Sequence, residues 1–140
     1  MAYEINLPVY FDDVDAAGVV YYPRILDKCH QAFEALFTDC GDTPYHELFL
    51  HRKIGFPSRS LEVEFFAPVE YNGPITLKIS TSKVTPRSAH FIFEGHQGNR
   101  LCFRAVVGKV CCTHQVGGKL EPVEIPDDIR RLLVDLGDPS

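Results

Sequence analysis

The chain has few of the features that would assign it to a class at once. Its 140 residues include no tryptophan and one methionine, and 14 basic against 19 acidic residues give a formal net charge of −5. Nucleic-acid binding needs a basic face, so this balance argues against nucleic acid as a partner. The longest stretch without charged or strongly polar residues, 16–23, is far shorter than the roughly 20 residues of a membrane span. We therefore expect no nucleic-acid and no membrane partner.

Cysteine is present in an odd number and in no metal-binding pattern. None of the five cysteines forms a CxxC pair, which argues against a disulfide framework and against a zinc site. Reduced thiols are typical of the cytoplasm, and the first residues do not resemble a secretory signal. The expected location is therefore cytoplasmic.

Several catalytic and cofactor motifs are also missing. The sequence contains no Walker A motif, no Rossmann glycine motif, no GxSxG elbow and no HExxH. The stretch from Asp13 begins like a calcium loop, but its fifth position is Ala17 and its twelfth is Arg24, which supply no ligands. We predict no metal and no cofactor.

What is present suits one folded domain covering residues 1–140. Hydrophobic residues make up 45% of the chain, and 10 phenylalanines and 6 tyrosines are enough for a core. Alternating apolar residues predict a strand from Tyr3 to Phe11. From Pro23 the period becomes helical, and Gly41 is a plausible end. The predicted buried side of this helix consists of Ile25, Cys29, Ala32, Phe33, Leu36 and Phe37, and the opposite, polar side includes Lys28.

The rest of the chain has the pattern of strands. Alternating runs near 60–65, 75–80 and 89–94, and a longer apolar run over 101–113, are separated by turns, and a short helix begins at Pro126. Consecutive strands predict an antiparallel meander, against which the long helix buries its apolar side. The expected class is α+β, a hot-dog fold with a curled antiparallel sheet wrapped around one long central helix. Exposed sheet edges predict a homo-oligomer.

The start of the long helix is the best candidate site. Asp15 precedes small residues and Gly18, which let a substrate approach the backbone closely. The backbone N–H groups of Val20, Tyr21 and Tyr22 are expected to be unpaired and to stabilise an oxyanion, while Asp15 attacks a carbonyl or activates water. The alternative is that Asp15 merely caps the helix, which is common for aspartate.

A family resemblance bears on this choice. Residues 11–23 read FDDVDAAGVVYYP, which resembles the active-site segment of the 4-hydroxybenzoyl-CoA thioesterase family of hot-dog enzymes. The resemblance continues through 55–57, 65–68 and 125–127, and stretches 15–21 and 29–34 are similar to 1,4-dihydroxy-2-naphthoyl-CoA thioesterases. It implies hydrolysis of an aromatic acyl-CoA thioester, in a tetramer built from dimers whose neighbouring subunits complete the pocket.

The resemblance also implies roles for particular residues. Asp15 becomes the catalytic carboxylate and the Tyr22 N–H the donor that polarises the thioester carbonyl, with Val20 beside it. His30 stands where the hydroxybenzoyl enzyme has an acidic residue in its acyl pocket, and an imidazole can donate or accept there. The alternative for His30 is a core histidine bonded to a backbone carbonyl.

Coenzyme A itself needs a slot and cations. By resemblance, Phe56 and Pro57 lie beside the catalytic loop, and the turn with Arg87 and Ser88 binds the CoA phosphates. A solvated surface arginine is the alternative for Arg87, and residues 51–53 form a second small basic cluster.

Two other functions remain open at this point. One is a thioesterase for short-chain aliphatic acyl-CoA, as in related enzymes linked to the Tol-Pal system. The other is a hot-dog module that binds acyl-CoA without cleaving it, although such a module has no need of a carboxylate at Asp15. No His-Phe-Pro stretch like that of the hot-dog dehydratases is present.

Overall fold

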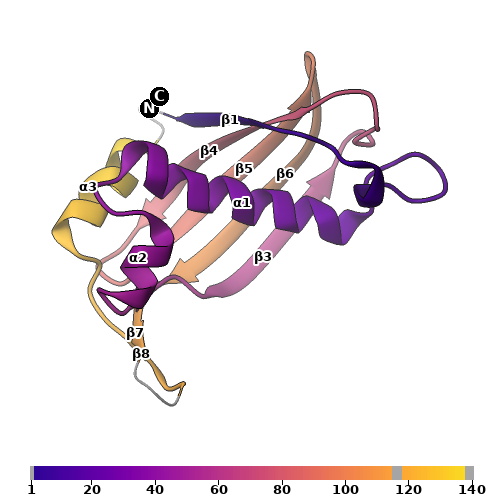
Figure 1. Cartoon of the computed structure of the whole chain (residues 1–140). Coiled ribbons are helices and arrows are strands. Elements are labelled where there is room, and N and C mark those ends of the chain that lie inside the picture. Colours follow the sequence, from indigo (N-terminus) through magenta and orange to yellow (C-terminus); the bar gives the residue numbers. More distant parts are fainter. Residues whose placement is uncertain (1, 115–117, 138–140) are drawn as a thin grey trace.

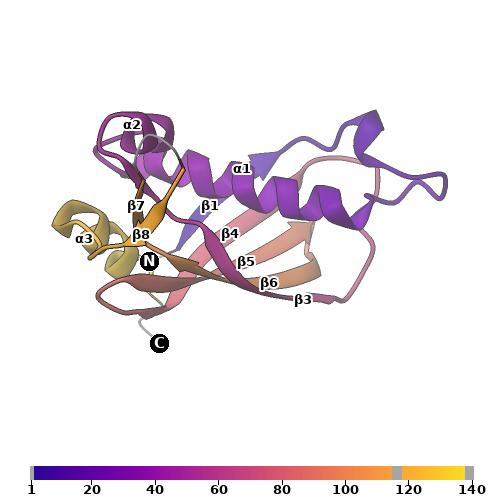
Figure 2. The same ribbon diagram turned by 90° about the horizontal axis from the view of Figure 1, so that it is seen from below.

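One long helix lies across the concave face of a curled sheet. The computed structural model describes residues 2–114 and 118–137. The helix, α1 (Tyr22–Cys40), crosses the five-stranded sheet in Figure 1, and Figure 2 shows the sheet bending around it. The predicted α+β architecture is confirmed.

The strand order departs from the predicted meander. Across the sheet the order is β1 (Tyr3–Leu7), β4 (Ile75–Val84), β5 (Ser88–Gln97), β6 (Arg100–Val110) and β3 (Ser58–Phe65), all antiparallel. The prediction is right for β4, β5 and β6. It is wrong for β3, which pairs with β6, because the connection 66–74 is long enough to carry the chain to the opposite edge. Both β1 and β3 are therefore edge strands.

Smaller elements also differ from expectation. The first strand ends at Leu7, and Phe11 lies in the short 3₁₀ helix η1 (Phe11–Asp13), 77% exposed. Helix α2 (Tyr45–Leu50) was not predicted because six residues are too few to show a helical period. The predicted long strand divides at Cys111, whose N–H donates to the Arg87 carbonyl at 2.7 Å. Beyond it, β2 (Ile54–Gly55), β7 (Cys112–His114) and β8 (Leu120–Pro122) form a second sheet, and α3 (Asp127–Asp135) follows.

The core lies between α1 and the sheet. All six residues of the predicted buried side of α1 are buried, and Phe33 contacts Phe37 and Phe91 in edge-to-face geometry. Gly41 ends the helix as predicted: its N–H donates to the Phe37 carbonyl at 3.0 Å, and a Cβ there would lie 2.8 Å from that oxygen.

All five cysteines are free. Four are buried, and Cys40 at the last turn of α1 is exposed. Burial raises the pKa of the Cys29 thiol to about 12. The four buried thiols therefore act as small apolar groups in the interior.

One residue predicted for the polar side of α1 is buried instead. Lys28 forms an ion pair with Asp13 at 2.9 Å, with side chains only 4% and 6% exposed. Asp13 also accepts a hydrogen bond from the Tyr10 N–H at 2.8 Å. Burial acts to raise the pKa of Asp13, but the hydrogen bond from Tyr10 and the Lys28 ammonium outweigh it, and the pKa is lowered. The pair therefore fastens the segment before α1 to the helix.

We predict that Asp13→Asn lowers the free energy of unfolding by about 3–5 kcal/mol, because it leaves Lys28 buried without a counter-charge. The pKa of Asp13 is lower in the folded chain than in the unfolded one. The stabilisation by the Asp13 carboxylate is therefore fully present above its pKa in the unfolded chain, about 3.9. It is lost as the pH falls through the lower pKa that Asp13 has in the folded chain. Urea unfolding at neutral pH and at about pH 3 measures both effects.

The matched control is Asp12→Asn, since Asp12 lies in the same 3₁₀ helix but is exposed. If the Asp13 and Asp12 variants unfold alike at neutral pH, the ion pair does not hold this segment.

Candidate active site

An open groove of about 510 Å³ lies at the N-terminal end of α1. One wall comes from the loop and first turn of the helix, the other from the end of β3 and the segment after it. The lining residues are Asp15, Val19, Val20, Tyr21, Tyr22, Ile25, Phe65, Ala67, Pro68 and Val69. The structure thus brings together three of the predicted site residues, Asp15, Val20 and Tyr22.

Asp15 heads a tight turn beside this groove. Its Oδ1 accepts hydrogen bonds from the N–H groups of Ala17 at 2.9 Å and Val19 at 3.4 Å. Gly18 closes the turn at φ +79°, a left-handed conformation that favours glycine. These contacts orient one carboxylate oxygen, and among the described residues Oδ2 has no hydrogen-bond partner. Gly18 shapes the turn but does not line the groove, so its contact with substrate stays a prediction.

The helix start differs in detail from the expectation. The N-cap of α1 is Tyr21, so the interpretation of Asp15 as the cap of this helix is wrong. The N–H of Val20 donates to the Val69 carbonyl at 2.7 Å and that of Tyr21 to the Asp13 carbonyl at 2.9 Å, so these two are not unpaired as predicted. Of the three predicted donors, only the Tyr22 N–H lacks an acceptor within residues 2–114 and 118–137.

The Tyr22 amide therefore stands alone at the positive end of a 19-residue helix. Pro23, the next residue, has no N–H to compete with it. A single free donor at a helix start, next to a carboxylate held in its own turn, can stabilise an oxyanion while the carboxylate acts on the carbon.

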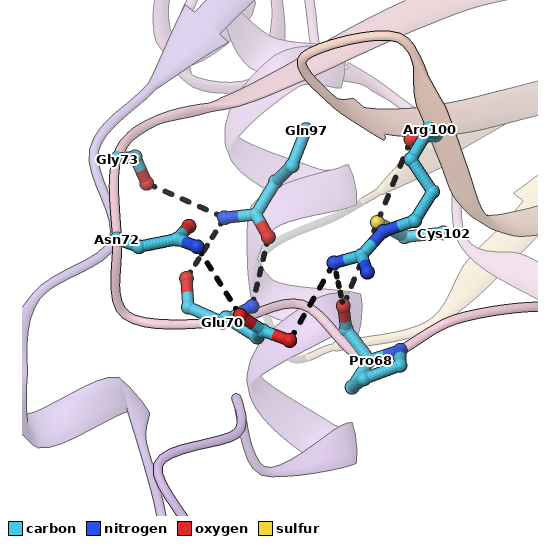
Figure 3. Close-up of polar contacts among 7 residues, drawn as sticks. All are labelled: Pro68, Glu70, Asn72, Gly73, Gln97, Arg100 and Cys102. Atoms are coloured by element: carbon cyan, nitrogen blue, oxygen red, sulfur yellow. Dashed lines mark hydrogen bonds and ion pairs between the residues drawn. The ribbon is translucent and has the colours of Figure 1, made fainter.

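The second wall of the groove is held by a polar network. Figure 3 shows Gln97, in β5, reaching the connection 66–74: it accepts a hydrogen bond from the Glu70 N–H at 2.8 Å and donates to the Glu70 carbonyl at 2.8 Å. Arg100 donates to the Pro68 carbonyl at 3.2 Å. The network fixes the segment whose Val69 carbonyl binds the Val20 N–H.

The remaining CoA-site predictions lie at the other end of the sheet. Phe56 is buried, with its ring against Phe33 and Phe37, and the Pro57 carbonyl accepts the Val110 N–H. Arg87 is exposed in the β4–β5 turn, and Ser88 faces Val110 in the sheet.

These residues are far from Asp15 within one chain. Ser58, next to Pro57, is paired with Lys109 at one end of β3, and Phe65 of the groove is at the other end. The strand is eight residues long, roughly 25 Å. One chain therefore does not bring Phe56, Pro57, Arg87 and Ser88 to the groove.

His30 is neither in the groove nor in the core. Its side chain is 55% exposed, its Nε2 lies 3.4 Å from Glu34 Oε2, and its ring stacks on Phe33. The interpretation as a core histidine is wrong. His30 lines a second cavity between α1 and the sheet.

Part of the second basic cluster, residues 51–53, already has partners within the chain. Arg52 donates two hydrogen bonds to Asp128, at 2.8 and 2.9 Å, and Lys53 donates to the Leu50 carbonyl. The Asp128 carboxylate raises the pKa of Arg52. Arg52 therefore joins the end of α2 to α3.

Besides Lys28, a second buried lysine was missed. Lys109 points from β6 to the core side of the sheet, following Ala105 and Val107 at the period of a strand. This alternation could have indicated that the Lys109 side chain points to the core. The apolar run over 101–113 predicts only a strand that is covered by a helix. Within the described parts of the chain, no group of residues suited to a metal and no membrane-spanning helix is found.

A curled antiparallel sheet around one long helix is the hot-dog architecture, and the first turn of that helix forms the candidate site. The chain belongs to the thioesterase-like superfamily, whose family pattern it matches over residues 9–133.

Known proteins resemble the chain over most of its length. A 1,4-dihydroxy-2-naphthoyl-CoA hydrolase of Nostoc punctiforme is 26% identical over 92% of this chain and 84% of its own. The acyl-CoA thioesterase YbgC of Haemophilus influenzae is 25% identical over 87% of both. The solved 4-hydroxybenzoyl-CoA thioesterase of Pseudomonas sp. strain CBS-3 has the same fold, with a TM-score of 0.80 and 23% identity over 94% of this chain and 98% of that one.

We predict that Gln97→Leu loosens the groove wall, because it removes both hydrogen bonds to Glu70 while keeping a side chain of similar size. Hydrogen exchange at the amides of Val20 and Glu70 should speed up by roughly 10-fold, the equivalent of one net hydrogen bond.

The control is Asn72→Ala, which removes a single exposed contact to Glu70. Unchanged exchange in the Gln97 variant would mean that the wall is held by other contacts.

Proposed function

We propose that the chain hydrolyses an aromatic acyl-CoA thioester to the free acid and CoA. The observation that carries the proposal is the Asp15 carboxylate and the free Tyr22 amide lining one groove at the positive end of α1. A thioester carbonyl placed between them has a donor for its oxygen and a carboxylate beside its carbon. The names of the relatives in Nostoc and Pseudomonas support an aromatic acyl group.

Two routes use the same residues. In the first, an Asp15 oxygen adds to the carbonyl carbon, the C–S bond breaks, and CoA leaves as a thiolate that takes up a proton. Water then hydrolyses the acyl–aspartyl anhydride and restores the carboxylate. In the second, Asp15 takes a proton from water, the hydroxide adds to the carbon, and the proton passes to the departing thiolate. In both, the Tyr22 N–H stabilises the oxyanion.

We predict that Asp15→Asn lowers kcat for 2-naphthoyl-CoA by at least roughly 1000-fold while Kd for the ester stays within a few fold, because the amide keeps the size of the side chain but is no base and a poor nucleophile. Steady-state kinetics and calorimetric binding measure the two quantities. The control is Asp12→Asn in the 3₁₀ helix just before the Asp15 turn, which should turn over normally. Near-normal turnover of the Asp15 variant would show that Asp15 is not the catalytic carboxylate.

A single turnover in ¹⁸O-labelled water identifies direct attack if it labels Asp15. Hydrolysis of the anhydride at the aspartyl carbon leaves one ¹⁸O in the Asp15 carboxylate, detectable by peptide mass. General-base catalysis puts the label only in the product acid, as does hydrolysis of the anhydride at the acyl carbon, so only a labelled Asp15 distinguishes the routes.

The acyl preference is tested by kcat/KM over benzoyl-, 4-hydroxybenzoyl-, 2-naphthoyl-, acetyl- and butyryl-CoA. Highest values for the short aliphatic esters would favour the alternative thioesterase, and binding without turnover of any ester would favour the acyl-CoA-binding module.

The site is proposed to be completed by a second copy. The outer edge of β3 is unpaired in the sheet, and Leu61, Phe65 and Phe66 near it are exposed apolar residues. Antiparallel pairing of two β3 edges around a two-fold axis places the Ser58 end of one copy against the Phe65 end of the other. The Phe56–Pro57 and Arg87–Ser88 regions of one subunit then approach the Asp15 groove of its partner. We infer a tetramer built from such dimers, in the cytoplasm.

A subunit-mixing experiment tests this arrangement. We predict that Asp15→Asn and Arg87→Glu homodimers are each impaired, and that mixed dimers, co-expressed with two tags and purified by both, regain activity. In a mixed dimer one site carries both lesions and the other carries neither. Mixed dimers no more active than the average of the parents would show that each chain forms its own site.

A further inference from the structure

A second cavity follows the groove along the seam between α1 and β3. Its volume is about 170 Å³, and a cavity of about 150 Å³ holds a benzene ring. Its walls are largely apolar, with Leu26 and Phe33 from α1, Leu61 from β3 and Val107 from β6. None of its lining residues lines the groove at Asp15.

The cavity contains one buried cation. Lys109 is 6% exposed, and its ammonium donates to the Phe56 carbonyl at 3.3 Å and to Ser58 Oγ at 3.0 Å. The Nζ also lies 4.5 Å from the centre of the Phe33 ring. An ammonium has three N–H donors, so these two acceptors leave one unused.

Lys109 has no counter-ion in its surroundings. Across residues 2–114 and 118–137, no carboxylate lies within 4.0 Å of its Nζ. The titratable groups of α1 that line the same cavity are Cys29 and His30. Burial lowers the pKa of Lys109 to about 8, so the cation is still the main form at neutral pH. A buried cation without an anion costs free energy, which an incoming anionic or acceptor oxygen would recover.

The cavity and the groove share their two walls. Ile25 of the groove is followed in α1 by Leu26 of the cavity, and Phe65 and Leu61 lie on the same face of β3. From Tyr22 to His30 the helix rises about 12 Å. Lys109 is at the Ser58 end of β3, but its ammonium also lies against the Phe33 ring of α1. An acyl group whose carbonyl lies at the Tyr22 amide can thus extend along α1 toward Lys109.

We propose that Lys109 determines the acyl specificity by binding an oxygen, a phenolic hydroxyl or phenolate, at the end of the aryl group remote from the thioester. The assignment rests on the proposed thioesterase function. The rings of the acyl group contact the apolar walls, and Ser58 and His30 are the polar neighbours of the same oxygen. The preferred substrate class is therefore a hydroxyaryl-CoA, with the hydroxyl on the far side of the ring system.

A matched pair of substrates tests the proposal. 6-Hydroxy-2-naphthoyl-CoA carries a distal hydroxyl, and 2-naphthoyl-CoA lacks it. Lys109→Met keeps a long apolar side chain and removes the charge. It should lower kcat/KM roughly 10- to 100-fold for the hydroxylated ester and change it by less than about 3-fold for the other, since only the hydroxylated ester has a charge-assisted hydrogen bond to lose. The control Lys78→Met, at an exposed position of β4, should alter neither value.

An equal loss on both esters would show a structural contribution of Lys109 and overturn the proposal, as would no loss on either. Calorimetric binding of the two free acids provides a readout that does not need turnover. The wild-type chain should bind 6-hydroxy-2-naphthoate more tightly than 2-naphthoate, and Lys109→Met should abolish the difference.

The two proposals fail in different ways. If no acyl-CoA is hydrolysed but the difference between the acids is present and depends on Lys109, the proposed catalysis is wrong and the oxygen-binding site stands. If the wild-type chain binds the two acids equally, the inference about Lys109 is wrong whether or not the esters are cleaved, and this comparison needs no variant.

Discussion

The ion pair between Asp13 and Lys28 ties the segment before α1 to the side of that helix. The same aspartate receives the Tyr10 N–H on its side chain and the Tyr21 N–H on its carbonyl. Removing both charges from water is costly, so the pair holds only because each charge has its partner in place. With Asp13 fixed, the turn that begins at Asp15 has one position relative to the first turn of α1. The free Tyr22 amide and the carboxylate then lie along one groove.

The second constraint is the distance between the two ends of the sheet. The groove is at the Phe65 end of β3, while Phe56, Pro57 and Arg87 are at the Ser58 end. One antiparallel sheet cannot bring its own ends together, but two sheets joined edge to edge around a two-fold axis place opposite ends side by side. The proposed catalytic groups and the proposed CoA-binding groups can therefore belong to the same chain and still meet only between chains.

Much of the fold follows from local pattern. The buried side of α1, Pro23 in its first turn and Gly41 at its end were predictable because helix period and terminal residues depend on neighbours in sequence. The position of β3 was not, since pairing with β6 rather than β4 depends on where a nine-residue connection crosses the sheet. Lys28 was predicted to be exposed because of its charge, and no position was predicted for Lys109. Burial of a lysine depends on partners far along the chain.

The candidate site was only partly predictable from the sequence. The residue types around Asp15 suggested an anion-stabilising helix start, and the resemblance chose between catalysis and capping. Local sequence did not reveal that the Val20 and Tyr21 amides are used by Val69 and Asp13, which leaves a single donor at Tyr22. That result depends on tertiary contacts, as does the separation of His30 from the groove.

The uneven exposure of the cysteines has a practical consequence. Cys40 is exposed at the end of α1 opposite the groove, whereas Cys29, beside the second cavity, is buried; burial raises the thiol pKa of both, so their reactivity differs through exposure. Maleimide chemistry at neutral pH should therefore attach a fluorophore selectively at Cys40. Such a dye would leave the groove untouched and allow energy transfer between labelled copies to follow their association in real time.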